Sequence, residues 1–357
     1  MRMTAPYWRP DSYEHRKPFL DVRQKVIRAI RATFEAENFN EVDTPCLQVS
    51  PGNEIHLQAF QTSLKESHGG ADQTLYLHTS PEFAMKKLLV AGEERIFQIA
   101  HVFRNGERSS RHHPEFSMME WYRANADTEV IMQDCVQIVR AAAKAANKKI
   151  FETGGMQCDP FAPWEKLSVA EAFTRYAKID LLATAPDPHH PDPTLLREAI
   201  AHLDIRITDE DSWDDLFFRI MGEKIEPFLG KDRPTFLCDY PISMAALARP
   251  KPEDPRLAER FELYITGVEI ANAFGELTDA DEQLRRFQAD MDLKEKLHGE
   301  RFPIDMDFID ALRHGMPPSA GIALGIDRLV MLCAGTENIE DVLWLPVSVS
   351  AGPHKND

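Results

Sequence analysis

Two predicted strands joined by one short polar loop constrain the fold of this chain most strongly. Residues 95–104 and 115–123 read as strands, and the loop NGERSSRHH joins them. Other strands are predicted at 234–241, 259–275 and 319–326, and helices at 21–38, 127–148, 280–298 and 306–314. Because strands joined as hairpins pair antiparallel, the pattern indicates an α+β fold: an antiparallel β-sheet flanked by helices, not a doubly wound sheet.

The stretch from about 150 to 235 departs from this pattern. Ser168 and Glu171 have the spacing of a capping box, and PDPHHPDP at 186–193 is a proline-rich connector. Helices are predicted near 194–203 and 212–228. We therefore predict one domain over residues 1–357, with a helical insertion at about 150–235.

Charge and hydrophobicity exclude several classes of protein. The 357 residues include 41 Lys and Arg against 58 Asp and Glu, a net charge of −17, which disfavours binding to polyanions such as tRNA. No run approaches the roughly 20 apolar residues of a membrane span, and the N-terminus MRMTAPYWRP lacks an apolar signal core. The five cysteines form no CxxC pair. We expect a soluble, cytoplasmic protein with no membrane contact, disulfide framework or structural zinc.

Residues 103–122, FRNGERSSRHHPEFSMMEWY, form the first segment with chemical content. Alternation along the second strand puts Phe116, Met118, Glu120 and Tyr122 on one face. The loop opposite supplies cationic side chains: Arg104, Arg108, Arg111 and His112. Aromatic rings stack on bases and arginines clamp phosphates, so the segment suits a nucleotide beside a cation. On composition alone, an ordinary hairpin with a basic, solvated loop is the simpler interpretation.

Two later segments also place unusual residues in strands. In RFELYITGVEIANAFGELTD, residues 260–279, acidic and amide side chains interrupt apolar strand positions: Glu262, Glu269, Asn272 and Glu276. Buried carboxylates are costly without cations, so a metal ion and an ammonium group would satisfy them; a solvated strand face is the alternative. In SAGIALGIDR, residues 319–328, the small side chains Gly321, Ala323 and Gly325 share one strand face, which suits either a ligand against the backbone or a packing kink.

In this order, the segments resemble the three signature motifs of class II aminoacyl-tRNA synthetases. EVDTPCL, with Pro45, resembles motif 1; FRNG…HHPEF resembles motif 2; GIALGIDR resembles motif 3. SPEFAMKKLLVAG and ERFELYITGVEIANAFGELTDA are similar to segments of lysyl-tRNA synthetases. The resemblance runs from about residue 20 to 347 and is weakest in the predicted insertion. It implies the class II catalytic core, ATP and Mg²⁺ as cofactors, and a homodimer formed through motif 1.

The resemblance also implies a nucleotide site. Arg104 would hold the α-phosphate and, with Arg328, act as a catalytic residue. Phe116 and Arg328 would enclose the adenine. The remaining residues implied for ATP are Arg111 and His112 at the terminal phosphates, and Glu262 and Glu269 as ligands of the Mg²⁺ that bridges phosphate oxygens.

An amino-acid site follows from the same resemblance. Glu82 would receive the backbone amino group of the substrate, with Ser80 beside it; both also suit the start of a helix at Pro81. The terminal ammonium would be held by Glu120, Tyr122 and Glu276, while Asn272 and Ala323 would lie near the substrate carboxylate and backbone.

Three departures from the lysyl pattern refine the expected function. Only 44 residues precede Pro45, too few for the helix at 21–38 and a five-stranded OB barrel, so we expect no anticodon-binding domain and no tRNA partner. Ala323 replaces a glycine, and SPEF replaces APEL; both changes resemble the ligases that attach (R)-β-lysine to a lysine of translation elongation factor P. Gly106 stands at the motif 2 glutamate, and Glu107 is the candidate replacement.

The leading hypothesis is therefore adenylation of (R)-β-lysine, or lysine, and its transfer to elongation factor P. A second hypothesis keeps the adenylation and changes the acceptor to a free small amine or a second nucleotide. A third is a non-catalytic regulatory paralogue that senses lysine. That hypothesis predicts loss of the metal carboxylates or the phosphate arginine, yet Arg104, Glu262, Glu269 and Arg328 are all present.

Overall fold

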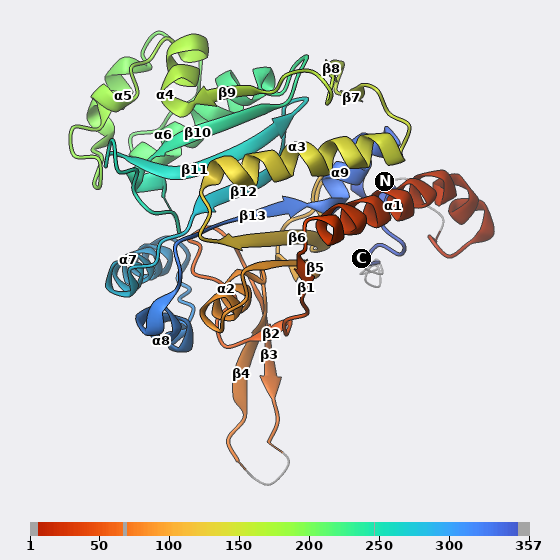
Figure 1. The fold of residues 1–357 in the computed structure, drawn as a ribbon. Coiled ribbons are helices and arrows are strands. Elements are labelled where there is room, and N and C mark those ends of the chain that lie inside the picture. The colour runs from red at the N-terminus through yellow and green to blue at the C-terminus, as the bar shows by residue number, and fades with distance from the viewer. Residues whose placement is uncertain (1–5, 67–69, 246, 349–357) are drawn as a thin grey trace, which may run out of the picture.

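A computed structural model describes residues 6–66, 70–245 and 247–348 (Figure 1). Residues 1–5, the start of the segment predicted to lack a signal core, lie outside the described residues. The centre of the fold is an eight-stranded sheet in the order β1-β5-β6-β13-β12-β11-β10-β9. Its strands are β1 Asn40–Glu41, β5 Arg95–Phe103, β6 Glu115–Ala124, β9 Glu165–Ser168, β10 Thr235–Pro241, β11 Leu257–Ile265, β12 Val268–Gly275 and β13 Ser319–Gly325.

The α+β class is confirmed, with one correction to the pairing of the strands. The six central strands, from β5 to β10, pair antiparallel, but β1 pairs with β5, and β9 with β10, in parallel. Each parallel pair contains a short edge strand, β1 or β9, which joins the sheet through long-range packing. Local hairpin signals do not report such pairs, because their partners are distant in the sequence.

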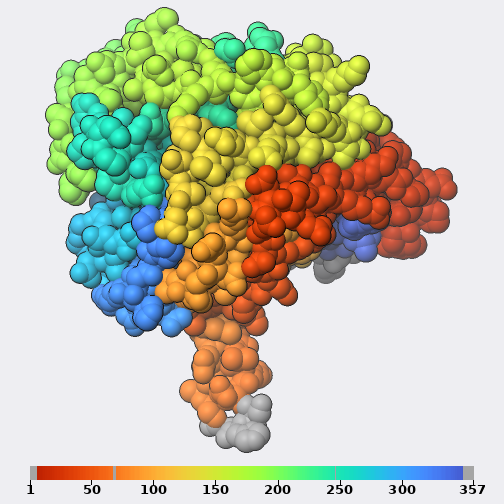
Figure 2. All heavy atoms as spheres, in the orientation of Figure 1, coloured from red at the N-terminus to blue at the C-terminus, as the bar shows by residue number. Residues whose placement is uncertain are grey.

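The segment resembling motif 1 forms strands on both sides of Pro45. After β1, the chain runs to β2 (Leu47–Gln48), which joins a second sheet with β3 (Phe60–Leu64) and β4 (Gln73–Leu77) in the order β2-β4-β3. Figure 2 shows the β3–β4 hairpin as an arm that projects from the body of the molecule.

Helices cover one face of the large sheet. The three that contribute to its main core are α1 (Pro10–Ala36), α3 (Thr128–Ala145) and α9 (Ile326–Ala334), seen across the front in Figure 1. Met119 and Trp121 of β6 point into this core, whereas Tyr122 belongs to a second cluster with α2 (Glu82–Val90), α7 (Ala280–His298) and α8 (Met306–Gly315). Strand alternation therefore separates a packed face from the opposite face, where Phe116 and Tyr122 line a cavity.

Helix α1 begins earlier than predicted. It starts at Pro10 and continues through Pro18, although proline removes one backbone hydrogen bond from a helix. Arg16, which is 3% exposed, donates from Nη1 to the carbonyl of Leu343 at 2.6 Å. This contact anchors the first turns of α1 to a segment more than 300 residues away, which the local sequence does not reveal.

The region predicted as a helical insertion also contains strands. Residues 151–158 form the hairpin β7 (Phe151–Thr153) and β8 (Met156–Cys158), and β9 is an edge of the main sheet. The helices follow: α4 Val169–Ala172, α5 Pro193–Ala199 and α6 Trp213–Ile220, with π-helical turns at Phe173–Ala177 and Met221–Ile225. The capping box of Ser168 and Glu171 is confirmed at the start of α4. No helix in the described ranges is long and apolar enough to span a membrane.

Candidate active site

A cavity of about 520 Å³ opens on the face of the sheet opposite α1 and α3. Its walls come from the β5–β6 loop, strands β6, β11, β12 and β13, and helices α2, α6 and α7. Nearly all the predicted site residues line it: Ser80, Glu82, Arg104, Glu107, Arg111, His112, Phe116, Tyr122, Glu262, Glu269, Asn272, Glu276, Ala323 and Arg328. Glu120 lies behind this wall, hydrogen-bonded to two of its residues.

One end of the cavity is acidic and deeply buried. Glu276, 1% exposed, follows β12, and Glu82 is the first residue of α2. Between them lies Lys86, 0% exposed, whose Nζ is 2.5 Å from an oxygen of each carboxylate. Burial raises the pKa of Glu276 to about 7, although the ammonium of Lys86 opposes that rise. Among the described residues, Oε1 of Glu276 has no hydrogen-bond partner.

Glu120 extends this acidic end into β6. It is 1% exposed and accepts hydrogen bonds from Ser80 Oγ at 2.5 Å and from the Tyr122 hydroxyl at 2.8 Å. Burial, followed by the nearby charge of Glu82, raises the pKa of Glu120 to about 8. Ser80 also accepts from the backbone N–H of Glu82 at 3.0 Å, so it assists the helix start as predicted, although Pro81 occupies the N-cap position.

Small side chains in β13 make room for this end of the cavity. Gly321 faces Tyr122 across the β13–β6 pair, and a Cβ on Gly321 would lie 2.2 Å from the Tyr122 ring and 2.7 Å from Glu276 Oε1. Ala323 faces Glu120 on one side and Asn272 on the other. Gly321 was predicted to leave room either for a ligand against the backbone or for a packing kink, and the structure shows that the ring of Tyr122 occupies that room.

The other end of the cavity is cationic and aromatic. The Arg104 guanidinium lies over the Phe116 ring at 5.4 Å from its centroid. Within the described part of the chain, the buried Arg104 Nε has no hydrogen-bond partner. A buried N–H without a partner is costly, so this donor fits an anionic ligand such as a phosphate.

Arg328 lies at the same end, at the start of α9. It donates to the Glu269 carbonyl at 2.9 Å and contacts His112 Nε2 at 2.8 Å. Burial and the charge of Arg328 lower the pKa of His112, so the imidazole is neutral at pH 7. The cation over the Phe116 ring is Arg104, and Arg328 is directed to His112 and Glu269.

Arg260 lines the cavity and was not among the predicted site residues. Its guanidinium donates to Glu262 Oε1 at 2.7 Å, to Asn272 Oδ1 at 3.2 Å and to the Met244 carbonyl at 2.5 Å. The Tyr264 hydroxyl donates to the other Glu262 oxygen at 2.8 Å. The carboxylate of Glu262, which was predicted to need a cation, is therefore already paired with Arg260 and hydrogen-bonded to Tyr264.

Glu262 and Glu269 are the carboxylates to which the resemblance assigns Mg²⁺. Both carboxylates line the cavity. Burial, together with the charge of Glu262, raises the pKa of Glu269 to about 7. The side chain of Glu269 is nevertheless 42% exposed, on the side that faces the cavity. No group of three or more His, Cys, Asp or Glu side chains in the described ranges could hold a metal ion. Mg²⁺ commonly takes one or two carboxylates plus substrate phosphates, so this pair fits an ion that arrives with a nucleotide.

The departure at Gly106 has a conformational explanation. Gly106 has φ +80°, a left-handed backbone that a glutamate adopts only with strain, and a Cβ there would lie 3.3 Å from Gln58 Oε1. The next residue, Glu107, lines the cavity. The turn at Gly106 thus brings the carboxylate of Glu107 to the cavity, the position for which it was predicted as a replacement.

A buried ion pair at the edge of the cavity fixes the elements that carry the site, and one of its members, Asp327, lines the cavity. Arg23 of α1 pairs with Asp327 and donates to Ser117 Oγ at 2.8 Å. Asp327 also accepts from the Ser117 backbone N–H at 2.7 Å. These contacts join α1, β6 and the start of α9, and therefore set the position of Arg328 relative to the β6 face.

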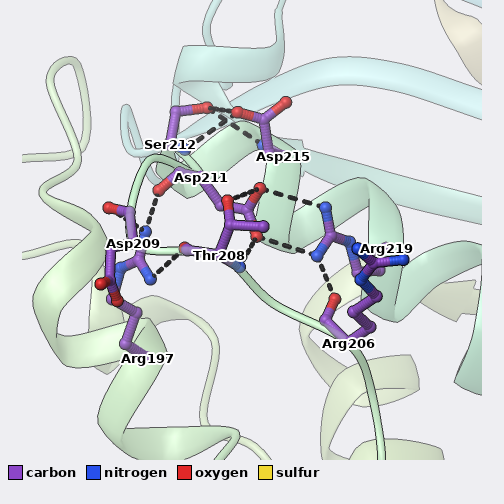
Figure 3. Close-up of polar contacts among 8 residues, drawn as sticks. All are labelled: Arg197, Arg206, Thr208, Asp209, Asp211, Ser212, Asp215 and Arg219. Carbon is purple, nitrogen blue, oxygen red and sulfur yellow. Dashed lines mark hydrogen bonds and ion pairs between the residues drawn. The ribbon is translucent and has the colours of Figure 1, made fainter.

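Helix α6 brings two unpredicted residues, Asp214 and Phe218, to the cavity wall. The loop before α6 is held by arginines, as Figure 3 shows: Arg219 pairs with Asp211 at 2.8 Å, and Arg197 donates to the Thr208 carbonyl at 2.6 Å. Burial raises the pKa of Asp214 to about 6. Glu54 and Asp290, from two other segments, also line the cavity, and the charges of Glu54 and Asp214 both act on Asp290, so this part of the wall is an acidic cluster.

Some of these unpredicted residues had a local signal. Lys86 is one helical turn after Glu82, and Arg260 shares a strand face with Glu262, so spacing could have paired them. Asp214 and Phe218 had no such signal, because they lie where the resemblance is weakest and reach the cavity through tertiary packing.

Comparison with known proteins identifies the family of this chain. The family model described as tRNA synthetases class II (D, K and N) matches residues 1–349. The chain belongs to this family.

Curated relatives share nearly the whole chain. An elongation factor P–(R)-β-lysine ligase of Yersinia enterocolitica is 41% identical over 327 residues, covering 91% of this chain and 94% of the relative. Proteins of the same name from Salmonella arizonae and Hamiltonella defensa are 39% and 38% identical, over 95% and 91% of this chain and 97% and 94% of their own lengths. The family match agrees with the α+β fold of this chain, a large sheet with an antiparallel centre and helices on its faces.

Proposed function

We propose that this protein activates (R)-β-lysine, or lysine, with ATP and transfers it to a lysine side chain of translation elongation factor P. The observation that carries the proposal is the polarity of one cavity. Its buried acidic end, with Glu82, Glu120 and Glu276, suits the ammonium groups of a diamino acid. Its cationic end, with Arg104 and Arg328, suits the phosphates of a nucleotide.

In the proposed reaction, the carboxylate of the amino acid attacks the α-phosphorus and pyrophosphate leaves. Arg104 Nε, which lacks a protein partner in the described ranges, would donate to the α-phosphate and oppose the charge that builds up on it. Glu262 and Glu269 would hold Mg²⁺, which supplies Lewis acidity at the phosphate oxygens. An amine of the acceptor then attacks the carbonyl of the aminoacyl-adenylate, forms an amide and releases AMP. No protein nucleophile is needed, since orientation and charge stabilisation lower the barrier.

The choice of acceptor rests on the relatives, which are named elongation factor P–(R)-β-lysine ligases. The acidic cluster of Glu54, Asp214 and Asp290 in the cavity wall agrees with a cationic acceptor side chain. The net charge of −17 agrees with an acceptor other than tRNA. Because the protein would modify a translation factor, we propose that it acts in the cytoplasm.

The test is to incubate the protein with ATP, Mg²⁺ and elongation factor P, with (R)-β-lysine or α-lysine, and to measure the intact mass of the factor. A gain of one lysyl residue, larger with (R)-β-lysine, is the expected result. Pyrophosphate release without a gain on the factor would contradict the acceptor. Absence of pyrophosphate release with both amino acids would contradict adenylation and support the regulatory alternative.

Ala323→Gly tests the preference between the two lysines. The Ala323 methyl lies in the β13 wall of the cavity, between Glu120 and Asn272. Its removal enlarges the space for the backbone of an α-amino acid, and one methyl group discriminates by about 1–3 kcal/mol. We expect the ratio of kcat/KM for (R)-β-lysine over α-lysine to fall by about tenfold in pyrophosphate exchange. An unchanged ratio would show that Ala323 does not select the substrate.

We also propose that the protein is a homodimer. The support is the segment resembling motif 1, in which Leu47 and Val49 are 45% and 50% exposed next to Pro45. Apolar side chains that are half exposed in one protomer suit an interface. Sedimentation equilibrium is expected to give twice the mass of the chain, and Leu47→Glu with Val49→Glu is expected to give the monomer.

A further inference from the structure

Lys86 is a buried lysine whose ammonium is held between two carboxylates of the cavity. It is 0% exposed, and its Nζ lies 2.5 Å from Glu82 Oε1 and 2.5 Å from Glu276 Oε2. Burial alone lowers the pKa of Lys86, but the charges of Glu276 and Glu82 outweigh burial and raise this pKa above its ordinary value. The ammonium is therefore charged, although it is closed off from solvent.

Lys86 does not line the cavity, whereas both of its partners do. The two partners come from distant parts of the chain, since Glu82 begins α2 and Glu276 follows β12. An ammonium between them sets the separation of their oxygens, and one Glu276 oxygen is left without a hydrogen-bond partner in the described ranges. Lys86 therefore affects the cavity indirectly, through Glu82 and Glu276, which line it.

The charges at this end of the cavity match a ligand with two ammonium groups. Three carboxylates, Glu82, Glu120 and Glu276, stand against one ammonium, that of Lys86, which leaves two negative charges when all are ionised. Of the other groups nearby, Tyr122 stays neutral because burial raises its pKa, and Arg249 pairs with Glu259 at 2.6 Å. A diamino acid carries two ammonium groups, which balance the cluster once Glu120 and Glu276 have released the protons that burial favours on them, since burial raises the pKa of Glu120 to about 8 and that of Glu276 to about 7.

We propose that Lys86 is a positioning residue, whose ammonium holds the carboxylates of Glu82 and Glu276 at a fixed separation, ready to bind the two ammonium groups of a diamino acid. This inference rests on the proposed function, because it takes a lysine-like amino acid as the ligand. Without the lysine, the two carboxylates would face each other with no cation between them, and the pKa of the buried Glu276 would rise further, because Lys86 opposes its rise. A protonated carboxyl attracts an ammonium group weakly, so the affinity for the amino acid would fall.

The test is Lys86→Met, which removes the charge and keeps an unbranched side chain. Binding of (R)-β-lysine is measured by calorimetry without ATP between pH 6 and 9.5. At pH 7, we expect Kd to rise at least about tenfold, the equivalent of one pKa unit. We also expect the pH above which the affinity levels off to move upward by about one unit. KM for ATP, measured by pyrophosphate exchange at saturating amino acid, is expected to stay unchanged.

Lys87→Met is the matched control on the same helix. Lys87 also makes two ion pairs, with Asp305 at 2.8 Å and Asp307 at 2.7 Å, but these lie at α8 and none of the three residues lines the cavity. We expect this variant to bind (R)-β-lysine with the wild-type Kd and pH profile. A folded Lys86→Met protein with wild-type Kd and pH profile would overturn the inference, and so would equal changes in the two variants.

Where Lys86→Met does not fold, Lys86→Arg answers the same question. Arginine keeps the charge but changes the distance between the two carboxylates. The pH profile is expected to stay in place while Kd rises several-fold, and a wild-type Kd would overturn the positioning role.

The calorimetry needs no ATP, so it can distinguish a failure of this inference from a failure of the proposed function. A wild-type protein that binds the amino acid but releases no pyrophosphate contradicts the proposed function, whereas active wild-type enzyme with an unaffected Lys86→Met variant contradicts the role of Lys86.

Discussion

Single side chains at the acidic end of the cavity are packed against one another with little spare volume. Tyr122 lies against the backbone of Gly321, and its hydroxyl reaches Glu120, which in turn holds Ser80. Each of these residues was predicted to contact the amino acid or to make room for it. The structure adds that they also contact one another, so a change in one is expected to disturb the next.

Gly321→Ala is expected to impair amino-acid binding. The new methyl group would lie 2.2 Å from the Tyr122 ring, so the ring must move, and overpacking of this kind costs about 1–3 kcal/mol. We expect KM for the amino acid to rise about tenfold or more in pyrophosphate exchange. Gly222→Ala is the control, because no atom lies within 4 Å of a Cβ there. Equal KM values for the two variants would contradict the proposed contact.

The pH dependence of stability tests the burial of Glu120. Its pKa rises from 4.5 to about 8 on folding, so the folded protein holds a proton that the unfolded chain releases. The free energy of unfolding of the ligand-free protein should therefore fall as pH rises from about 4.5 to 8, by up to about 1.4 kcal/mol per pH unit for this group.

Thermal unfolding measured at pH 5.5, 7 and 8.5 checks this expectation. Glu120→Gln, which can still accept from Ser80, is expected to show a smaller fall in Tm across the range. Some fall remains, because burial also raises the pKa of Glu276 and of Glu269 to about 7. A wild-type slope in Glu120→Gln would contradict the raised pKa of Glu120.

At the scale of elements, α6 shows how a segment outside the matched motifs contributes to the cavity. Arg197 and Arg219 hold the loop that leads into α6, chiefly through Asp211 (Figure 3). A capping box of Ser212 and Asp215 then fixes the first turn of the helix. Together these contacts set the direction in which Asp214 and Phe218 point.

Arg219→Met is expected to loosen this wall of the cavity. It removes the pair with Asp211 and the contact with the Arg206 carbonyl, at a cost of about 1–3 kcal/mol of local stability. We expect faster amide hydrogen exchange over residues 204–220 and a several-fold higher KM for the amino acid. Arg301→Met, which removes exposed ion pairs on α7, is the control. Unchanged exchange over 204–220 would show that the network does not hold the loop.

At the scale of the whole molecule, the N-terminal helix and the C-terminal helix are joined through the site. Arg23 of α1 pairs with Asp327 of α9, and both are buried, at 6% and 1% exposure. Asp327 precedes Arg328, so the position of a proposed catalytic residue depends on a helix some 300 residues away.

Arg23→Met is expected to destabilise the protein by about 3–5 kcal/mol, because Asp327 is left buried and unpaired. Arg31→Met, on the same helix, removes an exposed pair with Glu41 and is expected to cost about 0–1 kcal/mol. Urea unfolding of both variants measures the difference. Similar midpoints for the two would contradict a buried, structural role for Arg23.

The sequence alone determined what depends on local order. Alternation in β6 assigned Phe116, Glu120 and Tyr122 to one face, because side chains change sides at every residue of a strand. The polar loop after Phe103 predicted the β5–β6 hairpin, and the helices predicted at 280–298 and 306–314 are confirmed as α7 and α8. The prediction of one strand over 259–275 was wrong: the chain turns at Thr266 and Gly267, both at positive φ, and forms the hairpin of β11 and β12. Nearly all the residues that the matched motifs named do line the cavity. Their roles in catalysis stay predictions.

Tertiary structure decided whatever requires partners distant in the chain. It placed Lys86 between Glu82 and Glu276, put Asp214 of α6 in the cavity wall, and added the parallel edge strands β1 and β9. The early start of α1 likewise depends on Arg16 reaching Leu343. The physical reason is that a buried charge is stable only beside its partner, and the chain brings such partners together through packing that no local pattern records.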